Sequence, residues 1–173
     1  MATGEIVPAR IFGINKGAAG TPGELKGAFE PGTLGRLIRN GENGLYGTLT
    51  MFPLGQTLPV ACRQQVQRGA AQVLTTLSGT QPKLYAVEIE QVRQVGVNAT
   101  RHLVVRVTDQ RLLTLTGGIV QGMSGSPIIQ DGRLVGAVTH VLVDDPTRGY
   151  GIFAEDMLET AQAVVEGQRD EAS

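Results

Sequence analysis

The distribution of glycine and proline constrains the fold of this chain more than any other feature. The sequence has 24 glycines and 8 prolines in 173 residues, and they fall between short runs rich in Val, Ile, Leu and Thr. Because glycine and proline favour turns, this pattern is typical of many short strands joined by turns. A chain of this length can bury roughly 70% of its unfolded surface in a core of its own. We therefore expect an all-β fold.

Two segments show the alternation of a half-buried strand. In residues 85–90 and 103–108, apolar side chains recur at every second position, which places them on one face of a sheet. Asp131-Gly132 separates the apolar runs 127–130 and 133–142, and this dipeptide favours the tight turn of a hairpin. The other expected strands, with loops at 15–23 and 144–149, are 4–14, 33–39, 44–50, 58–66 and 70–77.

Only the C-terminal segment has helical periodicity. Glu155 and Asp156 suit the positive N-terminal end of a helix, and Gly167 is a typical stop. We expect a surface helix docked on a β-barrel, with residues 168–173 frayed. The expected apolar face of this helix consists of Met157, Leu158, Ala161, Val164 and Val165.

Composition argues against several classes of function. The formal net charge is -1 and the 15 basic residues are scattered, so the chain has no field that would attract nucleic acid. A single cysteine, Cys62, rules out an internal disulfide and offers no ligand set for zinc. No run approaches 18 apolar residues, and we expect no leader, since no charged segment followed by an apolar one stands at the start. We expect no cofactor.

The segment Gln121-Gly-Met-Ser-Gly-Ser-Pro127 has the composition of a nucleophile loop. A serine hydroxyl needs a base to take its proton and backbone N–H groups to stabilise the oxyanion. Gly122 and Gly125 permit backbone conformations that other residues avoid. They allow the N–H groups of Gly122 and Ser124 to form an oxyanion hole, with Ser124 as nucleophile.

The context of this segment favours a site over an ordinary Gly/Ser turn, which is the alternative. Thr116-Gly-Gly-Ile-Val precedes it and a hairpin follows it directly, which is typical of trypsin-like enzymes. A strand-turn-helix nucleophile elbow has a different order. The residues after Ser124 would form a wall along which a protein or peptide substrate lies as an extended strand.

Residues 117–153 closely resemble the stage IV sporulation protein B peptidases of endospore-forming bacteria. The resemblance extends upstream through Thr108-Asp-Gln-Arg-Leu-Leu113, Gly44-Leu-Tyr-Gly-Thr-Leu49, Leu58-Pro-Val-Ala61 and Gly17-Ala-Ala-Gly-Thr-Pro-Gly-Glu24. It implies a trypsin-like double β-barrel, truncated at the N-terminus, with a C-terminal helix. It also implies that Asp109 and Ser124 belong to a His, Asp, Ser triad.

The same resemblance places the catalytic histidine upstream of residue 4, in a Gly-Ala-Leu-Gly-His segment, together with a PDZ domain and a membrane anchor. Residues 1–173 would then be the peptidase domain without these parts. The parent protein would act outside the cytoplasm, between the two membranes around the forespore. There it would cleave membrane-anchored regulatory proteins and so signal sigma-factor activation.

Two histidines could replace the upstream base. His102 precedes Asp109 by seven residues on the same expected strand, so their backbones would lie roughly 23 Å apart, too far for a hydrogen bond. His140 shares an expected face with Leu134, Val138 and Leu142, and we assign it a structural or substrate-groove role, with an alternative role as the base.

We therefore expect the chain to fold but to have little or no peptidase activity, because Ser124 lacks its general base. A second hypothesis is a non-catalytic β-barrel module that binds an extended peptide, with Ser124 vestigial. A third is an esterase or acyltransferase that uses the same oxyanion hole, although the α/β pattern usual in such enzymes is missing.

Overall fold

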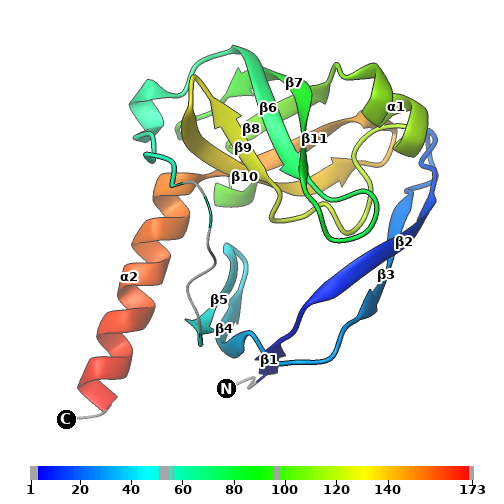
Figure 1. The fold of residues 1–173 in the computed structure, drawn as a ribbon. Coiled ribbons are helices and arrows are strands. Elements are labelled where there is room, and N and C mark those ends of the chain that lie inside the picture. Colours follow the sequence, from blue (N-terminus) through cyan, green and yellow to red (C-terminus); the bar gives the residue numbers. More distant parts are fainter. Residues whose placement is uncertain (1–3, 51–54, 56, 96–97, 172–173) are drawn as a thin grey trace.

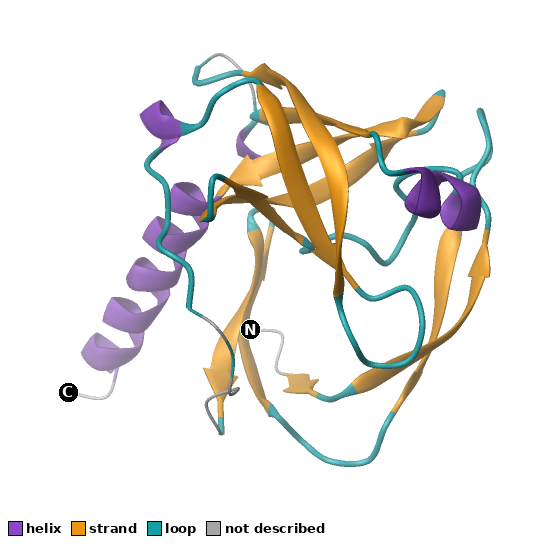
Figure 2. Ribbon diagram, turned by 45° about the horizontal axis from the view of Figure 1, so that its top comes forward, coloured by secondary structure: helices purple, strands orange, loops and turns teal. Residues whose placement is uncertain are grey.

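The computed structural model describes residues 4–50, 55, 57–95 and 98–171, with side chains to Gly167. A closed six-stranded barrel forms the main body. Figure 1 shows the N-terminal strands below this barrel and the C-terminal helix descending at its side. Figure 2 shows the same barrel from a tilted direction, with its strands wrapped around a common axis. The all-β class with a trypsin-like barrel is confirmed.

The barrel consists of antiparallel strands in the order β10-β11-β8-β7-β6-β9. Alternate side chains point inward, as the period of two predicted, so Tyr85, Val87 and Ile89 of one strand are all buried. Phe153 and Leu103 are fully buried at its centre. The strands are β6 (Gly69–Thr75), β7 (Lys83–Val92), β8 (Leu103–Val107), β9 (Pro127–Gln130), β10 (Arg133–Leu142) and β11 (Asp145–Phe153).

The predicted hairpin at Asp131-Gly132 is confirmed. Gln130 pairs with Arg133 across the turn. Both central residues have positive φ, 49° for Asp131 and 72° for Gly132, which is the conformation that a tight hairpin turn requires. The strand after Ser124 therefore folds straight back along its neighbour.

The N-terminal strands form two small sheets that stay separate from each other. One contains β1 (Gly4–Ile6), β4 (Gly35–Gly41) and β5 (Gly44–Leu49), in the order β1-β4-β5, and the other pairs β2 (Ala9–Asn15) with β3 (Glu24–Phe29). Within the described residues they do not close into a second barrel. Large apolar side chains stay at the surface here, with Phe12 68% and Phe29 85% exposed.

The predicted strand at 58–66 is wrong. Val60 forms one isolated bridge with Leu134, and Arg63–Gln65 form the 3-10 helix η1. The Gln65 side chain accepts a hydrogen bond from the Cys62 N–H and so favours the helical turn. The segment consequently follows the barrel for one bridge only.

Other strand boundaries also differ from the sequence prediction. The expected strand 4–14 is two strands, because Val7-Pro8 interrupts it. The loop expected at 144–149 is wrong, since β11 begins at Asp145. Strand β3 was not predicted, because its side chains are mostly exposed and show no apolar alternation. The loop at 15–23 is confirmed, apart from one isolated bridge within it.

A short helix, α1 (Gln110–Thr116), was not predicted. Its seven residues are too few for helical periodicity to stand out. The Asp109 side chain caps its N-terminus, and Gly117, with φ of 77°, donates its N–H to the Leu113 carbonyl at its C-terminus. These end signals, and not an apolar face, define the helix.

The C-terminal helix, α2 (Ala154–Glu171), is confirmed, although it continues past the predicted stop at Gly167. Its first turn is tied to the barrel by the Arg63–Glu155 ion pair at 2.6 Å. Farther along, Leu158 and Val165 of the predicted apolar face are about half exposed, with fractions of 47% and 50%. Met157, Ala161 and Val164 of the same face are half-buried, so α2 packs most closely at its start and only partly beyond it. No helix in the described part of the chain is long and apolar enough to cross a membrane.

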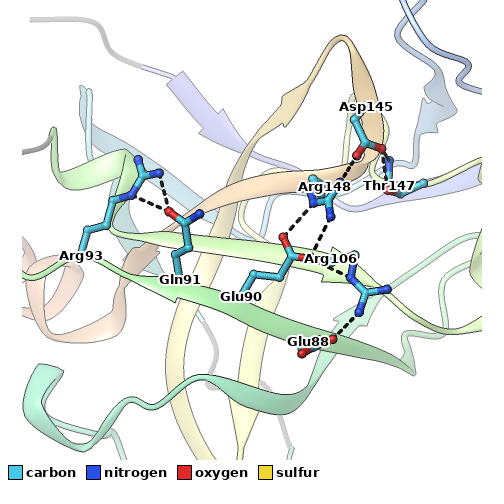
Figure 3. Close-up of polar contacts among 8 residues, drawn as sticks. All are labelled: Glu88, Glu90, Gln91, Arg93, Arg106, Asp145, Thr147 and Arg148. Carbon is cyan, nitrogen blue, oxygen red and sulfur yellow. Dashed lines mark hydrogen bonds and ion pairs between the residues drawn. The ribbon is translucent and has the colours of Figure 1, made fainter.

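An ion-pair network covers the outside of β7, β8 and β11 (Figure 3). Glu90 lies between two arginines and accepts hydrogen bonds from Nε of Arg106 and Nε of Arg148, each at 2.8 Å. Arg148 also contacts Asp145, and Arg106 contacts Glu88. The Arg148 guanidinium, with help from Arg106, holds the pKa of Glu90 below its usual value. This network joins three strands on one face of the barrel.

Candidate active site

Ser124 lies in the loop that leads from α1 into β9. Gly122 and Gly125 have φ of 95° and 86°, so both predicted glycines take up the conformation that other residues avoid. The loop is fixed by two backbone hydrogen bonds, from the Ser126 N–H to the Met123 carbonyl at 3.0 Å and from the Gly125 N–H to the Val138 carbonyl at 2.8 Å. Local glycine conformation and the adjacent strand thus position the loop.

Besides that of the buried Val120, two N–H groups of this loop make no hydrogen bond to the described residues, those of Gly122 and Ser124. They are the two groups that the sequence assigns to an oxyanion hole. Gly122 and Ser124 are exposed, so both N–H groups can donate to the oxygen of a ligand. The N–H of Gly125, in contrast, is already used by the barrel.

The Ser124 side chain is exposed, and its hydroxyl donates a hydrogen bond of 2.7 Å to the carbonyl oxygen of Thr139. Thr139 in turn donates from Oγ1 to the carbonyl oxygen of Thr100 at 2.6 Å. Met123, next to the serine, is buried at 1% exposure and anchors the loop in the core. The hydroxyl therefore points at the backbone of β10 in this conformation.

Ser124 separates two cavities. The first, which we call the hairpin cavity, has a volume of about 260 Å³ and lies between the β4–β5 turn and β10. The second, the threonine cavity, has about 360 Å³ and lies toward β2 and β6. The hairpin cavity is lined by residues 40–45, Ser124, Gly125, residues 137–140, Ile152 and Met157; the threonine cavity by Ala9, Ile11, Leu25, residues 74–76, Thr80, Pro82, Gly122 and residues 124–127.

His140 lines the hairpin cavity together with Ser124. The expectation that it packs on an apolar face is wrong, because its side chain is exposed. The pairing of β10 with β11 shifts register between Val138 and Val141, and this irregularity breaks the alternation on which the expectation rested. The ring makes no hydrogen bond with any residue of the described chain.

His102 lies elsewhere, at the C-terminal end of the 3-10 helix η2 (Ala99–Arg101). It is buried at 7% exposure, its Nδ1 lies 2.9 Å from an oxygen of Asp156, and its ring centroid lies 4.9 Å from that of Phe153. Asp156 also accepts a hydrogen bond from Arg63 at 3.0 Å. His102 thus helps to tie α2 to the barrel and is not paired with Asp109.

Asp109 is the N-cap of α1, and both of its oxygens are occupied. They accept hydrogen bonds from the N–H groups of Arg111, Leu112 and Ala86, and Nη2 of Arg111 lies 2.7 Å away. The Arg111 guanidinium and these N–H groups hold the pKa of Asp109 far below its usual value, although burial opposes them. Asp109 lines neither of the two cavities beside Ser124.

Comparison with known protein families identifies the family of this chain. The family model described as SpoIVB peptidase S55 matches residues 1–158 of the 173. The chain belongs to this family. No curated protein matches it. The region of this SpoIVB peptidase that matches the family model includes the N-terminal sheets, the whole barrel and the start of α2.

One part of this SpoIVB peptidase site was not foreseen from the sequence, namely the β4–β5 turn at residues 40–45. Glu42 and Asn43 occupy the turn itself, since Gly41 pairs with Gly44. The Asn-Gly-Glu-Asn-Gly order of residues 40–44 is a turn signal that carries a carboxylate. That signal predicts an exposed acidic turn but gives no indication of the cavity that the turn faces.

Proposed function

We propose that the chain is the peptidase domain of a serine endopeptidase in which Ser124 is the nucleophile. The observation that carries the proposal is an exposed serine beside two N–H groups without partners, between two cavities. A base takes the Ser124 proton while Oγ bonds to the scissile carbonyl carbon, and the oxyanion accepts hydrogen bonds from the N–H groups of Gly122 and Ser124. The amine then leaves with that proton, and water hydrolyses the acyl-enzyme.

The general base of this mechanism has two candidates. By resemblance to the family it comes from a histidine upstream, so residues 1–173 alone react slowly. His140 is the second candidate, because it lines the cavity that also contains Ser124. The triad role of Asp109 stays a prediction, and its contacts support a different role, in holding α1 and β7 together.

The biological setting follows the family. We propose a SpoIVB-type role in sporulation signalling, with membrane-anchored regulatory proteins as substrates and the parent protein between the two forespore membranes. The substrate would bind as an extended strand that crosses Ser124, with one side in each cavity.

A fluorophosphonate probe tests the catalytic proposal. We expect slow labelling of the chain, complete loss with Ser124→Ala, and acceleration when free imidazole is added, because imidazole supplies the missing base. A longer chain that carries the upstream segment should label fast. Rapid labelling of the short chain that disappears with His140→Gln would instead assign the base to His140.

A non-catalytic peptide-binding module is the second candidate function. It is favoured by the hydrogen bond that ties the Ser124 hydroxyl to the Thr139 backbone. If neither imidazole nor the upstream segment produces labelling at Ser124, the catalytic proposal fails and this reading replaces it.

A further inference from the structure

The two cavities beside Ser124 differ in charge. Glu42 is the single carboxylate among the residues that line the hairpin cavity. The threonine cavity is lined entirely by uncharged residues, three of them the threonines Thr75, Thr76 and Thr80. A substrate that crosses Ser124 therefore meets a negative charge on one side only.

The Glu42 carboxylate is available for a ligand. Its side chain is exposed and has no hydrogen-bond or ion-pair partner in the part of the chain that the structure describes. Arg39 and Glu42 both line the cavity between the turn and α2, but they make no ion pair, and His140 lines the hairpin cavity without a hydrogen bond to Glu42. No described residue therefore forms an ion pair with this carboxylate.

The walls of the hairpin cavity suit the stem of a long side chain. Ala137, Val138 and Ile152 are buried and form an apolar floor, and Leu45 and Met157 add apolar surface. Lysine and arginine place a chain of methylene groups along such surfaces while keeping the charged head near polar groups. Asn40 and Asn43 lie on the turn with Glu42 and offer amide oxygens to that head.

We propose that the hairpin cavity receives a lysine or arginine side chain of the substrate and that Glu42 determines this preference. This proposal rests on the proposed function, because that function makes the ligand a substrate. Binding of the side chain in the cavity does not itself require catalysis. Charge-assisted hydrogen bonds to Glu42 would favour a cation over an uncharged side chain of the same length by about 10-fold or more.

Amide chemical shifts of the chain test the binding step without any turnover. We expect n-pentylamine and n-butylguanidinium to perturb residues 40–45 and 137–140, with at least fivefold tighter binding than 1-pentanol. Glu42→Gln should remove the difference between the amine and the alcohol, whereas Glu166→Gln, an exposed change on α2, should preserve it. Equal binding of amine and alcohol, or a preference that survives Glu42→Gln, would overturn the proposal.

Peptide cleavage by the chain with imidazole provides the second arm. Peptides with lysine at one position near the scissile bond should be cleaved at least 10-fold faster than those with norleucine, and Glu42→Lys should reverse the preference toward glutamate. Cleavage that depends on Ser124 but ignores lysine would reject the role of Glu42 and leave the proposed function intact. Absence of Ser124-dependent reaction, with the amine still bound at Glu42, would reject the proposed function alone.

Discussion

The barrel and the N-terminal sheets bury their apolar side chains very differently. Phe153 of the barrel is fully buried, whereas Phe29 of the β2–β3 sheet is 85% exposed. The barrel strands form a closed ring, while β1 to β5 form two small open sheets. Because burial of apolar surface is the main stabilising term in folding, the barrel holds most of the stability. The nucleophile loop belongs to the barrel, and the Glu42 turn belongs to the less buried part.

This difference separates the two tasks of a peptidase site. Ser124 and the oxyanion N–H groups need fixed geometry, and the buried Met123 beside them provides it. The β4–β5 turn contacts substrate side chains, and it can vary in sequence without disturbing the core. Substitutions in the barrel should therefore change stability more than matched substitutions in the N-terminal part.

Phenylalanine truncation should give the largest contrast. We expect Phe153→Ala to lower the free energy of unfolding by about 3–5 kcal/mol, since it opens a cavity in the core. Phe29→Ala should change it by less than about 0.5 kcal/mol, as is usual at exposed sites. Urea unfolding followed by circular dichroism measures both. Similar losses for the two variants would show that the β2–β3 sheet is buried in solution.

Glycine replacement should give the next largest contrast. Gly118 has φ of 143°, and a Cβ there would overlap the backbone of Pro146. We expect Gly118→Ala to cost about 3 kcal/mol from overlap and strain together. Gly32, with φ of 111° and no neighbour at its Cβ, should cost only the strain of about 1–2 kcal/mol. Thermal melts of the two variants would check the order.

Removal of the α1 cap should have a moderate, pH-dependent effect. We expect Asp109→Ala to cost about 1–2 kcal/mol near neutral pH. The pKa of Asp109 is lowered in the folded state, mainly by Arg111, so its contribution is fully present above the unfolded pKa and is lost as pH falls through the folded pKa. Urea titrations from neutral to strongly acidic pH should show the two proteins converging only at the acidic end.

Asp109→Asn serves as the control for that experiment, because asparagine also caps helices. It should retain the larger part of the stability. If Asp109→Asn instead leaves stability unchanged but abolishes imidazole-assisted labelling of Ser124, the carboxylate acts in catalysis and the triad prediction holds.

The smallest effect should come from the ion-pair network. Glu90→Gln removes the shared partner of Arg106 and Arg148, and we expect a loss of about 0.5–1 kcal/mol that shrinks at high salt. Glu30→Gln, which removes the exposed partner of Arg10 in the N-terminal sheets, should give no measurable change. Urea midpoints at low and high salt would distinguish them, and an equal loss for both variants would contradict the contrast.

The parts of the fold that follow a local rule could be predicted from the sequence. The alternation in β7, the strand at β8 and the Asp131-Gly132 turn depend on neighbouring residues, and all three are confirmed, although Val104 of β8 is buried on the face predicted to be exposed. The prediction of a strand at 58–66 failed because a strand needs a partner strand along its length. The turn of η1 ends the pairing of this segment with the barrel. Helix α1 was missed since its caps define it, and caps leave a weaker trace than an apolar face.

Part of the candidate site could also be predicted from a local rule in the sequence. The glycine conformations at Gly122 and Gly125 follow from the motif and are confirmed. The neighbours of Ser124 across space are set by tertiary structure, so Glu42 could not be placed at its cavity from the sequence. A cap or turn role was the alternative for Asp109 because aspartate is common at such positions, and the structure shows it as the N-cap of α1. The apolar face expected around His140 was not found because β10 shifts register there, and its substrate-groove role stays a prediction.

The hydrogen bond from Ser124 to the Thr139 carbonyl also determines the fraction of the time in which the hydroxyl is free to react. A neutral hydrogen bond contributes a net of about 1 kcal/mol, which leaves the hydroxyl free in roughly one molecule in six at any instant. Every acylation rate of this serine is multiplied by that fraction, whichever base acts. A substrate strand that draws Thr139 away would raise the fraction toward one, so binding itself would speed the first chemical step.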